Sequence, residues 1–262
     1  MKKLSFNDLL ESARENFMEF IYPSGASCYL CDDDIDFITK SHLCSSCKSL
    51  LPFIKRPCKK CGKEIDENDS CRDCMAKKYY FNRAISVCNF EGVARECVYK
   101  YKGVPQRSLG EVMAFFMYCT YVNSKLNANA IICVPTSKVK MKERGFNPAR
   151  DLLVHINRRL HLEDLSKCVY EVDGISNQKA LGASDRAKNV KYKFKVRNAS
   201  KFKGKNILLI DDVLTTGATA NRIAQMLRYG GANKVYVLTF ASVKDEREKH
   251  EKAESLDELF DI

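Results

Sequence analysis

The chain has 262 residues, 45% of them hydrophobic, so it can bury one large core or one medium and one small core. No run of 18 apolar residues occurs, which excludes a membrane-spanning helix. Charged residues between Asp8 and Glu15 interrupt any signal-peptide core, so we expect a cytoplasmic protein. The formal net charge of +11 favours an acidic partner such as nucleic acid or a phosphorylated metabolite. The odd count of 13 cysteines argues against a disulfide framework.

The first predicted element is an amphipathic helix over residues 5–22, whose apolar side chains recur at helical spacing. Ser5 or Asn7 can cap its start, and Pro23 ends it. Its polar face is not rich in lysine, which favours a helix docked on its own protein; peripheral contact with a membrane surface is the alternative. We therefore treat residues 1–23 as a helix that precedes the next domain.

Four Cys-x-x-Cys pairs follow, and each pair can present two thiolates to one metal ion. The four histidines are scattered along the chain, so sulfur must supply the ligands. Redox-active pairs and iron–sulfur clusters are the alternatives, and the density of pairs disfavours the first. We predict a double zinc ribbon over residues 24–78 that holds two structural Zn²⁺ ions. The first site comprises Cys28, Cys31, Cys44 and Cys47, and the second Cys58, Cys61, Cys71 and Cys74, with a cross-braced exchange of pairs as the alternative.

From residue 79 to residue 243 the pattern alternates between strands and helices, which predicts an α/β domain with a parallel sheet. A charged tail, residues 244–262, ends the chain. Asn147 and Pro148 predict an N-cap and first turn for a helix that reaches about Leu160. The other expected elements are strands at 84–90, 130–134, 207–210 and 235–240, helices at 93–101 and 109–122, and a helix that stops at Gly230-Gly231.

The stretch from Asn206 to Ala220 has the succession of strand, acidic residues, loop and helix that is typical of a ligand site. Four aliphatic residues predict a buried strand, and Asp211 and Asp212 follow at its end. A loop of small and hydroxyl residues then leads into a helix, so its backbone N–H groups can hold a phosphate. A tight capping turn is the alternative. We predict that the two acids contact sugar hydroxyls or a metal, and that a phosphate binds at Thr215, Thr216, Gly217, Ala218 and Thr219.

This stretch resembles the phosphoribosyl-pyrophosphate (PRPP) loop of type I phosphoribosyltransferases. In that family the acids contact the ribose 2- and 3-hydroxyls and the loop holds the 5-phosphate, which implies Mg²⁺–PRPP as the ligand here. The basic loop over residues 135–147 lies where these enzymes carry a pyrophosphate-binding turn and a mobile catalytic loop. The resemblance implies pyrophosphate contacts at Thr136 and Ser137 and catalytic cations at Lys138 and Arg144. A solvated basic loop is the alternative.

Residues 190–197 alternate between apolar and basic side chains, which predicts a strand with one buried face. Its basic face can follow the phosphate backbone of single-stranded DNA. An edge strand protected from aggregation by its lysines is the alternative. The residues of this predicted cationic ridge are Lys191, Lys193, Lys195 and Arg197.

Several segments together resemble the ComF competence family, which joins an N-terminal zinc ribbon to a phosphoribosyltransferase-type domain. They are the cysteine pairs, the run from Glu143 to Asn147, spaced residues from Gln178 to Phe194, and the run from Ile210 to Thr219. Pro148 departs from the Gln usual in the family. The resemblance implies a PRPP-binding transferase that helps single-stranded DNA into the cytoplasm during natural transformation, with competence or DNA-processing proteins as partners. A metabolic phosphoribosyltransferase of unknown acceptor and a non-catalytic DNA-binding adaptor are the alternatives.

Overall fold

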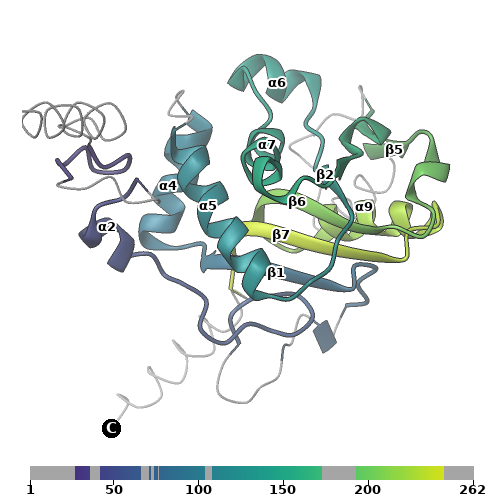
Figure 1. Ribbon diagram of the computed structural model, residues 1–262, viewed down its shortest axis with the longest axis horizontal. Helices are drawn as coiled ribbons and strands as arrows, with labels where there is room; N and C mark the ends of the chain where they lie inside the picture. The colour runs from purple at the N-terminus through teal and green to yellow at the C-terminus, as the bar shows by residue number, and fades with distance from the viewer. Residues whose placement is uncertain are drawn as a thin grey trace, which may run out of the picture. The chain divides into compact units, whose positions relative to one another are not determined.

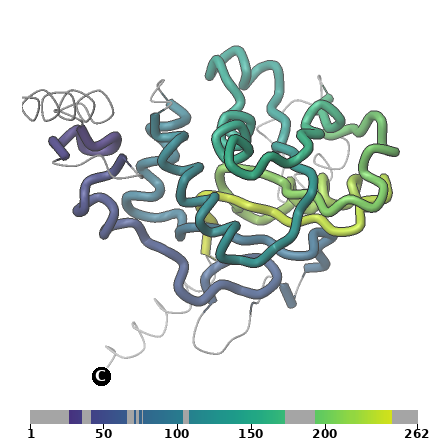
Figure 2. Tube along the Cα trace, viewed as in Figure 1, coloured from purple at the N-terminus to yellow at the C-terminus, as the bar shows by residue number. Residues whose placement is uncertain are grey.

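The computed structural model describes residues 27–35, 42–65, 71, 74–75, 77–103, 108–172 and 193–244 (Figures 1 and 2). These residues fall into two compact units, one up to Leu50 and one from Leu51 onwards. The helix predicted over residues 5–22 and the tail beyond residue 244 lie outside the described residues. Among the helices in the described ranges, none is long and apolar enough to cross a membrane.

The second unit is built on a five-stranded sheet in the order β1-β7-β6-β2-β3, and all of its pairings are parallel (Figure 1). The central strands are buried on both faces, which explains why they read as continuous aliphatic runs. The predicted α/β class with a parallel sheet is confirmed. The strands are β1 (Arg83–Asn89), β2 (Ala130–Cys133), β3 (Glu163–Asp164), β6 (Asn206–Leu214) and β7 (Lys234–Ser242).

Four helices of the second unit pack around this sheet. Helices α5 and α7 pack on each other and on the sheet, and α9 packs on the face that carries Ile207, Leu209 and Val237. The sequence predicted the start of α7 correctly, because the Asn147 side chain accepts a hydrogen bond from the Arg150 backbone N–H. The helices are α4 (Gly92–Gly103), α5 (Ser108–Asn123), α7 (Pro148–Leu160) and α9 (Ala218–Tyr229).

A small antiparallel sheet, made of β4 (Val169–Glu171) and β5 (Phe194–Val196), adjoins the main core. Phe194 and Val169 are buried in the same cluster as the residues beneath α9, so this small sheet is anchored to the domain. Three further short helical segments are α2 (Ser45–Ser49), η1 (Ser166–Cys168) and η2 (Ala199–Phe202).

Two local expectations were wrong. The strand predicted to end at Ile210 continues to Leu214, because Val213 and Leu214 pair with Ala241 and Ser242 of β7. The two acids therefore lie within β6 and not after it. The segment expected as a basic loop over residues 135–147 contains helix α6 (Lys138–Arg144), which Ser137 caps by accepting a hydrogen bond from the Lys140 backbone N–H. The run of charged residues in this segment hid the capping signal of Ser137 in the sequence.

The strand predicted over residues 190–197 is described only from Lys193 onwards, where β5 covers Phe194–Val196. Within this part the expected alternation holds: Phe194 is buried, Lys195 is exposed and Val196 is half-buried.

Candidate functional site

The first cysteine cluster lies in the first unit and is formed by short local contacts. Ser27 and Asp34 form a β-bridge, and the Asp32 N–H donates to the Cys28 carbonyl, which turns the chain so that Cys28 and Cys31 face one point. Cys44 is the N-cap of α2 and Cys47 lies inside that helix. The four sulfur atoms of Cys28, Cys31, Cys44 and Cys47 lie within 4.8 Å of one another.

The second cluster repeats this geometry in the second unit. Pro57 and Glu64 form the β-bridge, and the Gly62 N–H donates to the Cys58 carbonyl. The four sulfur atoms of Cys58, Cys61, Cys71 and Cys74 again lie within 4.8 Å of one another. Each set gathers two successive pairs, which is the grouping of the sequential assignment.

Both clusters fit a tetrahedral Zn²⁺ ion. Zn–S bonds of about 2.3 Å in a tetrahedron place the sulfur atoms about 3.8 Å apart. The Sγ atoms of Cys31 and Cys44 are 3.8 Å apart, those of Cys58 and Cys74 3.7 Å, and those of Cys61 and Cys71 3.4 Å. Four protein ligands leave no open coordination position, so these are structural sites and not catalytic ones.

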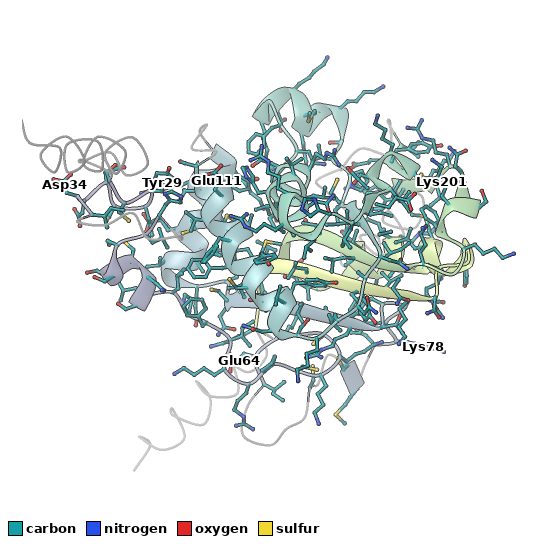
Figure 3. All side chains as sticks on the ribbon, in the orientation of Figure 1. Tyr29, Asp34, Glu64, Lys78, Glu111 and Lys201 are labelled. Atoms are coloured by element: carbon teal, nitrogen blue, oxygen red, sulfur yellow. The ribbon has the colours of Figure 1, made fainter. Side chains whose placement is uncertain are left out.

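The second ribbon is joined to the edge strand of the sheet. The Ala84 N–H donates to the Lys60 carbonyl at 2.8 Å, and the Ile54 N–H donates to the Val87 carbonyl at 3.1 Å. Glu64, labelled in Figure 3, accepts hydrogen bonds from the Lys55 and Arg56 N–H groups and from the Asn89 side chain. The ribbon therefore covers the free edge of β1, which would otherwise offer unpaired backbone groups to another chain.

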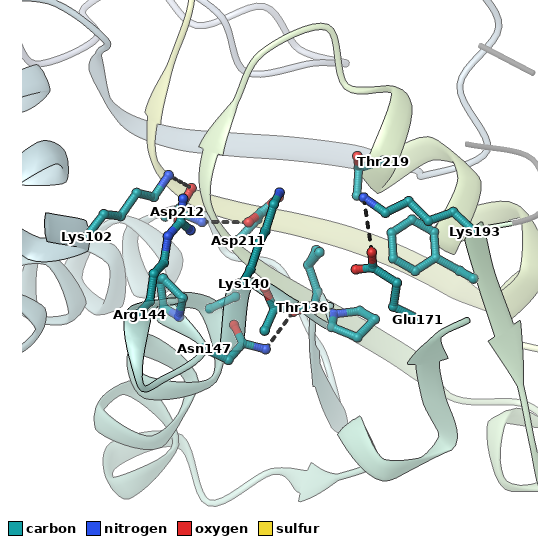
Figure 4. Close-up of a pocket in the computed structure, with 15 residues that line it drawn as sticks. Lys102, Thr136, Lys140, Arg144, Asn147, Glu171, Lys193, Asp211, Asp212 and Thr219 are labelled. Atoms are coloured by element: carbon teal, nitrogen blue, oxygen red, sulfur yellow. Dashed lines mark hydrogen bonds and ion pairs between the residues drawn. The ribbon is translucent and has the colours of Figure 1, made fainter. Parts of the chain in front are cut away.

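A pocket of about 200 Å³ opens beyond the carboxyl ends of β2 and β6 (Figure 4). In parallel α/β sheets this edge is where ligands bind. The structure brings together five of the residues singled out from the sequence for phosphoribosyl binding and catalysis: Thr136, Arg144, Asp211, Asp212 and Thr219. The other lining residues are Lys102, Val134, Pro135, Lys140, Asn147, Pro148, Ala149, Glu171, Lys193 and Phe194.

The two adjacent acids of β6 have different surroundings. Asp212 pairs with Lys102 from the last turn of α4, with 2.8 Å between the Lys102 Nζ and Asp212 Oδ1 atoms. Burial and the neighbouring Asp212 carboxylate raise the pKa of Asp211 to about 7, although the Asp212 N–H and two lysines act in the opposite direction. Asp212 is therefore the ion-paired carboxylate, and Asp211 is the one that holds a proton close to neutral pH.

Helix α6 brings two cations to the pocket, Lys140 and Arg144. Burial lowers the pKa of Lys140, and the nearby Lys193 and Arg144 lower it further. At the start of α7, the Asn147 amide donates to the Val134 carbonyl at 3.1 Å and ties this helix to the end of β2. The cations are thus held on a short helix that follows the same strand end.

Other predicted site residues do not line the pocket. Ser137 caps α6, and Lys138 is exposed at the start of that helix. Thr215, Thr216 and Ala218 are exposed, and Gly217 adopts a left-handed φ of 73° at the N-cap of α9. Thr215, Thr216 and Gly217 form the loop that joins β6 to α9, and Ala218 begins α9 directly before Thr219.

The predicted cationic ridge is divided. Lys191 lies outside the described residues, and Lys193 faces the pocket, where its Nζ atom is 3.4 Å from Glu171 Oε1. Lys195 and Arg197 are exposed, and the Arg197 Nε–H donates to the Lys167 carbonyl. Sequence reasoning missed Lys102 and Glu171 as pocket residues, because each is a lone charged residue outside any motif.

Comparison with known proteins accounts for both parts of the chain. Residues 17–75 match the double zinc ribbon domain, and residues 142–259 match the phosphoribosyl transferase domain. The chain is a double zinc ribbon joined to a phosphoribosyltransferase domain. The same two parts were predicted from the sequence, and the resemblance to competence proteins is confirmed by its relatives.

Three relatives are similar along most of their length. The chain is 27% identical to competence protein F of Haemophilus influenzae over 207 residues, which cover 76% of this chain and 90% of that protein. It is 28% identical to competence protein ComFC of Bacillus subtilis, over 76% and 88% of the two chains. It is 24% identical to the DNA utilization protein YhgH of Escherichia coli K12, over 74% and 88%. The chain is thus a distant homologue of these proteins.

Proposed function

We propose that this chain is a phosphoribosyltransferase-type protein that binds Mg²⁺–PRPP in the pocket at the carboxyl edge of its sheet. The observation that supports this most directly is the convergence of Asp211 and Asp212 with Lys140 and Arg144 around one cavity. Carboxylates suit ribose hydroxyls, and clustered cations suit phosphates. A phosphorylated sugar carries both hydroxyls and phosphates, so it matches a cavity lined by both carboxylates and cations.

In this proposal the 5-phosphate binds in the loop from Thr215 to Thr219, and Asp211 and Asp212 accept hydrogen bonds from the ribose hydroxyls. Pyrophosphate lies toward Thr136 and Ser137. Arg144 and Lys138 stabilise the negative charge that grows on the pyrophosphate as its bond to the anomeric carbon breaks. The protein contributes by positioning the reactants and stabilising charge.

The test is calorimetric titration of the zinc-loaded protein with PRPP and MgCl₂. The variant Asp211→Asn with Asp212→Asn should lose PRPP binding while its zinc content stays at two ions per chain. An unchanged dissociation constant in this double variant would refute the site assignment. Zinc content is the matched control, because the cysteine clusters share no residue with the pocket.

The pH dependence of binding tests the role of Asp211 separately. The carboxylate form accepts the hydroxyl hydrogen bonds, and its pKa is about 7, so protonation competes with the ligand below that pH. Each unit of pH below 7 should raise the dissociation constant by up to about tenfold. Titrations at pH 8 and pH 6.5 check this, and Asp211→Asn should bind weakly and equally at both. A flat profile in the unmodified protein would contradict the assignment.

The same pKa predicts that Asp211 costs folding stability. Its folded-state pKa lies above the ordinary value of about 3.9, so the folded protein holds the proton more tightly than the unfolded chain. The cost is therefore absent below about pH 4 and grows until about pH 7. Asp211→Asn should raise the melting temperature at pH 8 by a few degrees and by less at pH 5.5. This result would also show that the variant folds.

We further propose a cytoplasmic role in DNA uptake or utilisation, which the names of the relatives support. Lys195 and Arg197 are exposed beside the pocket wall and suit contact with single-stranded DNA. Their replacement by Glu should weaken binding of a fluorescent oligonucleotide and flatten the plot of log affinity against log salt by about 0.7 for each phosphate that the variant no longer neutralises. An unchanged slope would remove both residues from the interface.

We also propose that the chain is divided into domains as the sequence predicted, at residues 1–23, 24–78 and 79–243, with a tail at 244–262.

A further inference from the structure

The segment that joins the second zinc ribbon to β1 (residues 77–82, the connecting segment) lies against the proposed phosphate loop, residues 215–219. A Cβ atom at Gly217 would stand 3.3 Å from Tyr79 Cε1 and 3.8 Å from the Tyr79 hydroxyl oxygen. Gly217 is buried, whereas its neighbour Thr216 is exposed. The Tyr79 ring therefore occupies the side of Gly217 where any other residue would place its side chain.

Tyr79 is anchored in the core of the domain. Its ring stacks on Phe81, with 4.6 Å between the ring centroids and 23° between the ring planes. Phe81 is fully buried in the same cluster as the residues beneath α9, and Tyr79 packs against that cluster. A ring held in this way restricts the backbone of Gly217, which has a left-handed φ of 73° at the N-cap of α9. Tyr79 thus fixes one side of the phosphate loop.

A second contact joins the connecting segment to the first turn of α9. The Asn221 Oδ1 atom accepts a hydrogen bond from the Tyr80 N–H at 2.5 Å, and the Asn221 amide donates to the carbonyl of Lys78, labelled in Figure 3, at 3.2 Å. The Asn221 N–H donates to the Gly217 carbonyl at 2.8 Å. The connecting segment is therefore tied to the helix whose N-terminus completes the phosphate loop.

Both ends of the connecting segment are also tied to the second zinc site. Cys74, one of the four ligands, lies shortly before the segment. Lys60 precedes the ligand Cys61, and its ammonium donates to the Asn82 carbonyl at 3.3 Å. Residues 77–82 therefore lead without interruption from the zinc ligands to the phosphate loop.

We propose that Tyr79 is a positioning residue for the phosphate loop, and that through it the second zinc site and the phosphoribosyl ligand bind cooperatively. The inference rests on the proposed function. A loop that is fixed before binding loses less conformational entropy when phosphate binds, so affinity rises. Loss of the second Zn²⁺ releases the connecting segment from one end, loosens the contact between Tyr79 and Gly217, and weakens ligand binding. Because coupling between two binding equilibria is reciprocal, bound ligand tightens zinc binding at the second site.

The first test is calorimetric titration of the zinc-loaded protein with ribose 5-phosphate as the probe. Tyr79→Ala should raise its dissociation constant about tenfold, within the range of such couplings. Tyr79→Phe keeps the ring and should bind as the unmodified protein does. Tyr80→Ala is the matched control, because the Tyr80 ring contacts Tyr229 of α9 and its backbone N–H remains in the variant. Asn221→Ala leaves the aromatic contacts in place and should weaken binding as well.

The second test measures zinc affinity by competition with a chromogenic chelator. Saturating ribose 5-phosphate should raise the affinity for one of the two ions about fivefold or more and leave the other unchanged. Cys28→Ser with Cys31→Ser leaves only the second site and should keep this effect. Adding Tyr79→Ala to that variant should abolish it. A ring that only stabilised the fold would not link the two affinities in this way.

The proposal is overturned if Tyr79→Ala binds ribose 5-phosphate as the unmodified protein does, or if ribose 5-phosphate leaves both zinc affinities unchanged. It is also overturned if the ligand tightens zinc equally with and without Tyr79→Ala, since the coupling would then pass through folding in general. Should Tyr79→Ala not fold, Asn221→Ala takes its place in both tests. If the unmodified protein does not bind ribose 5-phosphate, the proposed function fails and this inference with it, whereas binding without these changes overturns the inference alone.

Discussion

The two zinc ribbons repeat one local structure in two different settings. In the first, the Cys28 N–H donates to the Asp33 carbonyl at 2.7 Å, and in the second the Cys58 N–H donates to the Lys63 carbonyl at 2.8 Å. The turn residue has a left-handed φ in both, 63° at Asp32 and 72° at Gly62. The spacing of the cysteines and one left-handed residue therefore suffice to shape either knuckle.

The surroundings of the turn residue differ. The second ribbon lies against β1, and a Cβ atom at Gly62 would stand 2.5 Å from the Ala84 carbonyl oxygen. At the equivalent turn, in the first unit, Asp32 is exposed and carries a full side chain. The comparison shows that local hydrogen bonds and one left-handed residue shape each knuckle, and that contact with β1 adds a steric requirement for glycine in the second ribbon.

The largest effect should come from removing one metal site at a time. Cys58→Ser with Cys61→Ser releases the second ion and frees the segment that covers β1, so the second unit should lose roughly 3 kcal/mol or more of unfolding free energy. Cys28→Ser with Cys31→Ser also removes one ion but should leave this transition in place. Zinc content by mass spectrometry and thermal unfolding of both variants check this. Equal losses would break the distinction between the ribbons.

A smaller effect should follow from placing alanine at each turn. Gly62→Ala places a Cβ against the Ala84 carbonyl in a left-handed conformation, and we expect a loss of about 2–4 kcal/mol. Asp32→Ala has the same backbone conformation with no new atom, so it should cost less than about 1 kcal/mol. Urea denaturation of both variants measures the difference. A loss of only about 1 kcal/mol for Gly62→Ala, which is the cost of a left-handed conformation alone, would mean that the contact with β1 does not explain the glycine.

The smallest effect concerns the side chain that joins the second ribbon to the segment before β1. The Lys60 ammonium donates to the carbonyls of Phe81 and Asn82. Lys60→Met should lower the unfolding free energy by about 1–2 kcal/mol with no change in zinc content. Lys59→Met, at the exposed neighbouring position, is the control and should be neutral. A neutral Lys60→Met would show that the backbone hydrogen bonds alone hold the ribbon in place.

The sequence alone determined the features that depend on neighbours along the chain. Cysteine spacing predicted both zinc sites, aliphatic runs predicted the buried parallel strands, and Asn147 with Pro148 predicted the start of α7. The stretch from Asp211 to Thr219 identified one wall of the pocket. Each of these signals is local, because a cap, a knuckle or a buried strand is specified within a few residues.

Only the tertiary structure decided which side chains meet in the pocket. Lys102 reaches Asp212 across 110 positions of sequence, and Glu171 meets Lys193 because β4 and β5 pair. The extension of β6 to Leu214 depends on the length of its neighbour β7. A lone lysine or glutamate carries no periodic or motif signal, and its role is set by what the fold places opposite it. These two lysine–carboxylate pairs are therefore properties of the folded domain and were invisible in the sequence.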